Sequence, residues 1–258
     1  MIEDDLLLAQ LWRAVSPRER DETSVVNALE ELLVAHGLKK DKAIVLDAAG
    51  GFGFPSVELT VRGWFVEYAD ASRAMFQEAV HRGWEQKAPN WDAMMFYGAG
   101  NRTWEDLKEL DDGMYDAVLC MGNSLPHAVT WGKDGNPGEA REAIVGALRQ
   151  FHRLLKQKGI LYVDKQVEGD PGALHHIERV ELRERPYDVS LITRNDPAHH
   201  LREWNAVLRN GDWAGTFGSR GYLLQENELL DLLHKAGFRD IRMATLRGDC
   251  YEGFTARK

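Results

Sequence analysis

Cysteine is scarce in this chain, and long apolar runs and sustained basic runs are lacking. The two cysteines, Cys120 and Cys250, stand far apart and outside any Cys-x-x-Cys pair, which indicates a reducing, cytoplasmic setting. No apolar stretch approaches the roughly 20 residues that cross a bilayer, so we expect no association with a membrane. The acidic N-terminal segment does not resemble a signal peptide.

The chain also lacks a basic surplus, because its formal net charge is −9. This balance argues against nucleic acid as a partner. Histidine pairs at 175–176 and 199–200 place neighbouring rings on opposite sides of a strand, so we expect no metal site. With 258 residues, 44% of them hydrophobic, the chain suits one large domain, or one domain with an insert, around a sizeable core.

Two motifs that bind phosphorylated nucleotides are missing. No Gly-x-x-x-x-Gly-Lys-Ser/Thr loop occurs, and the glycine run at 51–56 lacks the third glycine of a dinucleotide site. Pro55, near the start of the following helix, has no N–H group to offer a phosphate. The sequence therefore disfavours a ligand that is held by its phosphates.

What is present points to a ribose without a phosphate. The apolar run at 43–47 ends in Asp47, and glycines follow at once, as where a buried parallel strand delivers a ligand-binding turn. Gly51 and Gly53 permit close backbone approach. A second apolar strand ends in Asp70, where an acid can bind the two hydroxyls of a ribose. S-adenosyl-L-methionine is the common cofactor that fits both signals.

Strand and helix patterns alternate through most of the chain, which predicts an α/β fold with a mostly parallel, doubly wound sheet of seven strands. We expect its strands at 43–47, 64–69, 92–97, 115–121, 159–164, 239–246 and 251–257. Helices are expected at about 4–15, 22–37, 55–62, 71–82, 103–109, 138–157 and 225–236, with a polar break at 16–21. Strand-like alternation over 175–183, 187–194 and 200–209 predicts a small antiparallel insert after the fifth strand.

The most specific motif is the segment at 116–127, Asp-Ala-Val-Leu-Cys-Met-Gly-Asn-Ser-Leu-Pro-His. With the loop at 45–53 and Asp70-Ala71-Ser72, it resembles the glycine N-methyltransferases and glycine/sarcosine N-methyltransferases. The resemblance covers roughly residues 10–165. It implies the Rossmann-like fold of class I methyltransferases and S-adenosyl-L-methionine as the cofactor.

The resemblance also implies roles for single residues. It implies cofactor contacts for Trp12, Arg20, Asp47, Ala49, Gly51, Gly53, Asp70, Ala71, Asn101, Met121, Ser124 and His127. Arg18 is the alternative to Arg20. Asn123 would face the methyl acceptor and orient it. His127 is a candidate general base, since its unperturbed pKa suits neutral pH; a cofactor contact or a structural hydrogen bond is the alternative.

The sequence departs from that family where the acceptor would bind. Gln166 stands in the place of an arginine that grips the carboxylate of glycine, and glutamine cannot form two charge-assisted bonds to a carboxylate. Lys165 points to the other side of its strand. A neutral acceptor, such as a heteroaromatic nitrogen, is therefore a candidate. The acceptor contacts that we predict are Asn123, Lys165, Gln166 and Trp204.

The predicted organisation has three parts. A helical lid covers 1–40, the cofactor-binding core covers 41–166 and 219–258, and an insert at 167–218 covers the acceptor site. The predicted function is in-line transfer of a methyl group to an amine or ring nitrogen of a small molecule, in a protein that can form homo-oligomers. Transfer to oxygen or carbon of a secondary metabolite stays open. So does a cofactor-binding regulatory protein without catalysis.

Overall fold

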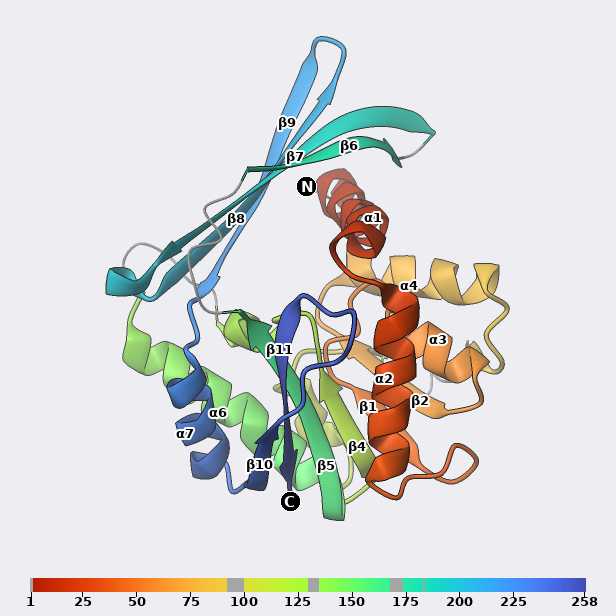
Figure 1. The fold of residues 1–258 in the computed structure, drawn as a ribbon, viewed down its shortest axis with the longest axis vertical. Coiled ribbons are helices and arrows are strands. Elements are labelled where there is room, and N and C mark those ends of the chain that lie inside the picture. Colours follow the sequence, from red (N-terminus) through yellow and green to blue (C-terminus); the bar gives the residue numbers. More distant parts are fainter. Residues whose placement is uncertain (1, 92–99, 130–134, 168–173, 183) are drawn as a thin grey trace.

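A computed structural model describes residues 2–91, 100–129, 135–167, 174–182 and 184–258, and Figure 1 shows two separate sheets with their helices. The larger sheet has the strand order β10–β11–β5–β4–β1–β2–β3. Its strands are β1 (Ile44–Asp47), β2 (Phe65–Asp70), β3 (Gly100–Asn101), β4 (Tyr115–Cys120), β5 (Leu155–Gln166), β10 (Arg239–Met243) and β11 (Tyr251–Arg257). All neighbours pair in parallel except β11, which is antiparallel to β5 and β10. The predicted α/β fold class is confirmed.

The helices alternate with these strands. Within the described ranges, the α-helices are α1 (Ile2–Glu19), α2 (Glu22–Ala35), α3 (Ser56–Val61), α4 (Arg73–Glu85), α6 (Pro137–Leu154) and α7 (Glu226–Lys235). Short 3-10 helices in these ranges are η1 (Asp106–Glu109), η2 (Leu125–Ala128) and η3 (Pro197–His199). Side-chain caps explain where three of the α-helices begin. Asp21 accepts a hydrogen bond from the Ser24 backbone N–H, Ser72 from Met75 and Asn136 from Gly138. Each cap satisfies an N–H group that the first helical turn leaves unpaired.

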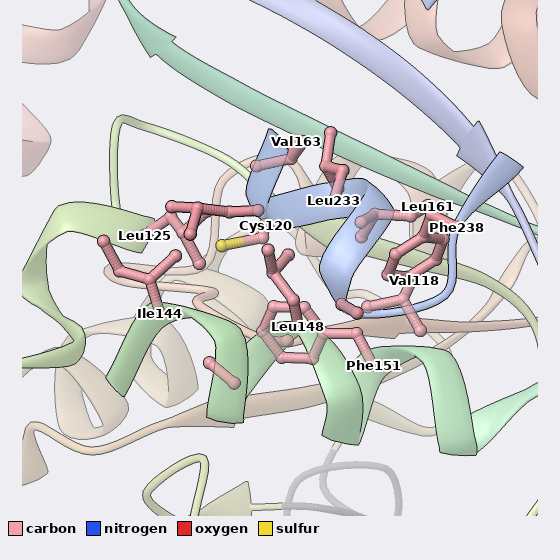
Figure 2. Packing of buried hydrophobic residues seen from close by; sticks show 14 of the residues in the cluster. Val118, Cys120, Leu125, Ile144, Leu148, Phe151, Leu161, Val163, Leu233 and Phe238 are labelled. Atoms are coloured by element: carbon pink, nitrogen blue, oxygen red, sulfur yellow. The ribbon is translucent and has the colours of Figure 1, made fainter. Parts of the chain in front are cut away.

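Alternate residues of the parallel strands face two different cores. On one face, Val118 and Cys120 of β4 pack against α6 and α7, together with Leu148 and Leu233 from those helices (Figure 2). On the other face, Leu119 packs with α2 and α3. A sheet that is buried on both sides explains the near-continuous apolar runs of its strands.

The second sheet stands above the carboxyl edge of the larger one, with α1 between them (Figure 1). Its antiparallel strands are β6 (Leu174–Leu182), β7 (Arg185–Asp196), β8 (Leu201–Asn210) and β9 (Trp213–Tyr222), and we call it the insert sheet. Its buried face packs on Leu11 and Val15 of α1. Trp12 of α1 stacks on Trp204 of β8, with ring centroids 4.4 Å apart. On its other side α1 reaches α4, where Arg13 pairs with Glu78 at 2.7 Å.

Four details differ from the sequence-based expectation. Helix α1 continues through the predicted break to Glu19, because Val15 and Ser16 are buried. Strand β5 begins earlier than expected, at Leu155, and the short helix after β3 is a 3-10 helix. Strand β9 was missed and continues past residue 218, because Gly215, Gly218 and Gly221 hide its alternation. The predicted strand at 92–97 lies outside the described residues, and the division into lid, core and insert stays a prediction.

Two helical glycines should respond to alanine with opposite signs. A Cβ at Gly83 would stand 2.0 Å from Cδ1 of the buried Trp91 ring, whereas a Cβ at Gly146 meets nothing within 4 Å. We expect Gly83→Ala to destabilise the protein by about 1–3 kcal/mol through overpacking. Gly146→Ala should stabilise it by up to about 1 kcal/mol, because alanine loses less backbone entropy in a helix. Urea unfolding of both variants gives the comparison, and a stabilised Gly83→Ala would contradict the packing described here.

Candidate active site

A cavity of about 760 Å³ lies at the carboxyl ends of β1, β2 and β4, and we call it the edge cavity. It is lined by five predicted cofactor residues, namely Ala49, Asp70, Ala71, Ser124 and His127, together with Trp104 and residues of α6 such as Ala143 and Gly146. Parallel strands of an open α/β sheet commonly place ligands at this edge. The structure therefore brings these five residues together around one space.

Asp70 connects the edge cavity to the glycine loop. One carboxylate oxygen accepts a hydrogen bond from the Gly51 N–H at 2.9 Å, and the other accepts one from the Ser72 N–H at 2.8 Å. Burial raises the pKa of Asp70, although these two backbone bonds oppose the shift. A carboxylate has about four lone-pair sites, so two remain to accept hydroxyl donors. Asp70 thus has the capacity to hold a diol such as that of a ribose.

The two glycines of the loop serve different purposes. Gly51 has a φ of +51°, and a Cβ at this position would meet nothing within 4 Å, so open space adjoins its backbone. Gly53 has a φ of +96°, but a Cβ there would lie 3.0 Å from Val57 and 3.2 Å from Ala79. Gly51 is therefore where a ligand can approach the backbone, whereas Gly53 allows α3 and α4 to pack closely.

Asp47 is fully buried and does not line the edge cavity. Its carboxylate accepts a hydrogen bond from the Ser56 hydroxyl at 2.6 Å, and a long one from the Ala49 N–H at 3.4 Å. Burial raises the pKa of Asp47 to about 7. Asp47 therefore links the end of β1 to the start of α3 through its hydrogen bond with Ser56.

Asn123 is buried at the end of β4, with a φ of +55°. Its side-chain oxygen accepts a hydrogen bond from the Gln166 N–H at 3.0 Å, and its own N–H donates to Asp164 at 2.6 Å. Asp164 also accepts from the Gly122 N–H at 2.9 Å. Burial, and secondly the nearby Asp249, raise the pKa of Asp164 to about 7. Asp164 lies two residues before the end of β5, whereas Asp47 and Asp70 are the last residues of β1 and β2. The strand expected at 159–164 ends in this aspartate, but the sequence analysis gave it no role.

His127 lies between the edge cavity and the insert sheet. Its exposed surface faces the edge cavity and a second cavity of about 650 Å³, which Glu203, Asn205 and Arg220 also line. Protein atoms around the ring lower the pKa of His127, because they disfavour its charged form. The positive charge of Arg202 lowers it further. The imidazole is therefore neutral at neutral pH and a weaker base than a free histidine.

The remaining predicted cofactor residues lie outside the lining of the edge cavity. Arg20 pairs with the buried Asp249 at 3.6 Å and lies over the Tyr251 ring, 4.9 Å from its centroid. Trp12 is packed against Trp204, as described above. Asn101 donates from its side chain to the Asp70 carbonyl at 2.8 Å. Met121 is buried, and its carbonyl accepts a hydrogen bond from the Ser124 hydroxyl at 2.6 Å.

Two of the predicted acceptor residues, Lys165 and Gln166, are neighbours on β5 and make different contacts. The Lys165 side chain is fully buried, and its Nζ donates to Glu252 at 2.7 Å and to the Gln166 carbonyl at 3.0 Å. Gln166 is only half-buried, and its backbone reaches Asn123 on the other side of the strand. The structure thus brings Gln166 and Asn123 together and leaves Lys165 apart from them.

Among the described residues, no group of three or more histidine, cysteine, aspartate or glutamate side chains is arranged to hold a metal ion. Within the same residues, no helix has both the length and the apolar character that crossing a bilayer requires.

Comparison with known proteins then identifies the relatives of this site. No family model matches the chain. The glycine N-methyltransferases of Oryctolagus cuniculus and Homo sapiens are each 30% identical to it over 159 residues, which is 60% of this chain and 50% of theirs. The glycine/sarcosine N-methyltransferase of Halorhodospira halochloris is 31% identical over 128 residues, 50% of this chain and 41% of that protein. The chain thus spans about half the length of the curated relatives it matches. The predicted resemblance is confirmed.

Solved structures extend the likeness to nearly the whole chain. An S-adenosylmethionine-dependent methyltransferase from Clostridium acetobutylicum aligns with a TM-score of 0.65 at 14% identity, over 97% of this chain and 96% of that one. The sugar N-methyltransferase KedS8 from a Streptoalloteichus species aligns with a TM-score of 0.64 at 17% identity, over 96% and 91% of the two chains. This is the Rossmann-like methyltransferase fold. At these identities the likeness concerns the fold alone.

The raised pKa of Asp47 has a consequence for stability that can be measured. The folded protein binds this proton more tightly than the unfolded chain, whose ordinary value is 3.8, so the proton's stabilising effect is complete below about pH 4 and lost by about pH 7. We expect the unfolding free energy of Asp47→Asn, minus that of the wild type, to rise over this range and to level off above it. Urea unfolding across the pH series measures the difference.

Asp106→Asn is the matched control for that experiment. Hydrogen bonds from Thr103 lower the pKa of this exposed carboxylate, so its ionised form is favoured by folding. The difference between Asp106→Asn and the wild type should therefore fall, not rise, as the pH increases through the acid range. If Asp47→Asn behaved like Asp106→Asn, the buried carboxyl group would be stabilised in its ionised form and our account of Asp47 would be wrong.

Proposed function

We propose that this protein is an S-adenosylmethionine-dependent methyltransferase that transfers a methyl group to a nitrogen of a small molecule. The observation that carries the proposal is Asp70, held by the Gly51 and Ser72 N–H groups in the wall of the edge cavity with acceptor capacity to spare. The fold and the relatives named above support the choice of cofactor and of nitrogen, because those relatives are N-methyltransferases.

The residues present fit such a cofactor. Asp70 would accept hydrogen bonds from the two ribose hydroxyls, and Ser124 and His127 would line the adenosyl group. The open backbone at Gly51 would adjoin the amino-acid part. Arg20, buried at the end of α1, would meet its carboxylate, since a guanidinium forks onto a carboxylate with two charge-assisted bonds.

The cofactor supplies a methyl group that its sulfonium already activates. The acceptor nitrogen would use its lone pair to form the new C–N bond as the C–S bond of the cofactor breaks and the thioether leaves. An amine would then release a proton to water, whereas a pyridine-type ring nitrogen has no proton to release and would keep the positive charge. The chain then has mainly to position the acceptor, an effect worth up to roughly 7–11 kcal/mol. Asn123 contributes by fixing the end of β4 against β5. His127, with its lowered pKa, serves better as part of the wall than as the base.

Asp70 is the residue on which cofactor affinity should depend most directly. We expect Asp70→Ala to raise the dissociation constant of S-adenosylhomocysteine at least tenfold, about 1.4 kcal/mol, because the charge-assisted bonds to the ribose are lost. Calorimetry on the folded variant measures the change. Asp116→Asn is the matched control, because Asp116 lies in the same sheet but bonds Ile44 and Lys156 at the opposite edge. Equal affinity for wild type and Asp70→Ala would remove Asp70 from the site.

A methyl-transfer assay tests the activity itself. Labelled cofactor is offered with a panel of amines, amino acids and ring nitrogens, together with oxygen and carbon acceptors. Transfer to nitrogen is the expected result. Transfer to oxygen or carbon alone would move the reaction to another acceptor atom on the same fold. Tight cofactor binding without any turnover would instead support a regulatory role, and no binding at all would defeat the proposal.

A further inference from the structure

We propose that β9 of the insert sheet pairs with β9 of a second copy of this chain, in antiparallel orientation and with Thr216 opposite its own counterpart. The two four-stranded insert sheets would then form one continuous sheet across a two-fold axis. Such a dimer goes beyond the proposed function and does not depend on it, so a failed methyl-transfer assay would leave it untouched.

The other sheet edges in the described part of the chain are protected against pairing with another molecule. An edge strand exposes unpaired N–H and C=O groups, and proteins protect such edges by short length, charged side chains or bulges. Strand β3 spans two residues. Strand β10 spans five, of which Arg239, Asp240 and Arg242 are charged. Strand β6 has a register shift against β7 between Ile177 and Val180.

Strand β9 has none of these protections. It runs for ten residues as the last strand of the insert sheet, and the β8–β9 hairpin projects away from the larger sheet (Figure 1). Its pairing with β8 continues from Tyr222 to Trp213 without a register shift. Proline is absent from β9, and Arg220 is its one charged residue. A long, regular and weakly charged edge is a template for a further strand.

The charges near β9 favour a second copy as that further strand. A strand that pairs with itself about a two-fold axis meets the same surface on both molecules. With Thr216 opposite Thr216, Asp212 in the turn before β9 comes opposite Arg220 of the second copy, and the same contact recurs at the other end. Opposite charges on facing positions stabilise a strand pair. A shift of two residues in either direction would remove both contacts.

Arg220 has the capacity for this second partner. Its Nε atom pairs with Glu203 of the neighbouring strand at 2.7 Å, and its side chain remains 44% exposed. The guanidinium carries further N–H donors beside the Nε atom. Arg220 can therefore keep Glu203 and also bind Asp212 of the second copy.

Side chains on the other face of β9 fit the same register. Gly215 would lie opposite Phe217 of the second copy, and the ring of Trp213 already covers Gly215, because a Cβ there would stand 2.5 Å from that ring. Trp213 is 47% exposed, although one edge of it packs on Tyr187. Phe217 of the second copy would therefore pack beside Trp213 and cover apolar surface that the single chain exposes.

The cavity of about 650 Å³ beside β9 would receive the turn of the second copy. Arg220 and Glu203 line this cavity, together with His127 from the larger sheet. Because Asp212 comes opposite Arg220, the hairpin turn at 210–212 of one molecule would enter this cavity of the other. His127 also lines the edge cavity, so each turn would stand close to the candidate site of its partner.

The first test measures association in solution. Sedimentation equilibrium of the full chain over a concentration series in the micromolar range should show a monomer–dimer equilibrium. Asp212→Lys should raise its dissociation constant at least about tenfold, because two attractive contacts become repulsive. Asp231→Lys, the same charge change at an exposed position of α7, should not. A wild type that stays monomeric, or two variants with equal effects, would overturn the proposal.

The second test checks the register with single cysteines at exposed positions of β9. In the proposed pairing, the Cα atoms of the two residues 216 lie about 5 Å apart, within the reach of a disulfide. Those of the two residues 214 lie about 14 Å apart, beyond it. Mild oxidation should therefore cross-link Thr216→Cys into a covalent dimer and leave Ala214→Cys at the level of the wild type. Equal cross-linking of the two variants, or none, would contradict this register.

Discussion

Carboxylates at the ends of buried parallel strands hold the loops from which the candidate site is built. Asp70 takes the N–H groups of Gly51 and Ser72, Asp164 takes those of Gly122 and Asn123, and Asp47 takes the Ser56 hydroxyl. Loops that leave parallel strands carry N–H groups with no partner in the sheet, and a buried N–H must find one. The loops around the edge cavity are therefore held both by these acidic side chains and by the glycines that allow the positive φ angles of the loop after β1.

This arrangement has a cost that links stability to ligand binding. Burial raises the pKa of each of the three carboxyl groups, to about 7 for Asp47 and Asp164. Burial therefore disfavours the ionised form of each group, and water or additional hydrogen-bond donors would stabilise that form. Two of them are closed off from the edge cavity, but Asp70 opens onto it. Hydroxyl donors that reach Asp70 would repay part of its desolvation, so the strain of burial is placed where a ligand can relieve it.

The sequence predicted the structure best where the residues of a single strand and the turn after it determine the local conformation. An apolar run that ends in an acid and a glycine turn identified β1, β2 and the edge at which they meet, because burial on both faces of a parallel sheet and the demand for φ > 0 are local constraints. Resemblance supplied the loop after β4. Five of the residues predicted to touch the cofactor do line the edge cavity, while Asp47 proves to be a brace inside the core.

What the sequence could not give depends on elements meeting across the fold. The residues around Trp12 and Trp204 in the sequence do not predict that the two rings stack. The glycines of β9 interrupt the alternation that would predict a strand. The reason for one of those glycines follows from its position in the fold. Gly221 leaves room for the His127 ring, and without that room the insert sheet could not come so close to the loop after β4.

The insert sheet and the loops of the edge cavity are built from separate elements, so that one can change while the other stays fixed. The loops at Asp70 and Asn123 belong to the larger sheet and are tied to its carboxylates. Strand β8 belongs to the insert sheet, whose contacts to α1 include the packing of its buried face and a hydrogen bond from Arg18 to the Arg179 carbonyl. A substitution on β8 alters the charge beside His127 without touching any backbone bond that shapes the edge cavity. In the function proposed above, this separation would allow the residues around the acceptor to change without altering the loops that would hold the cofactor.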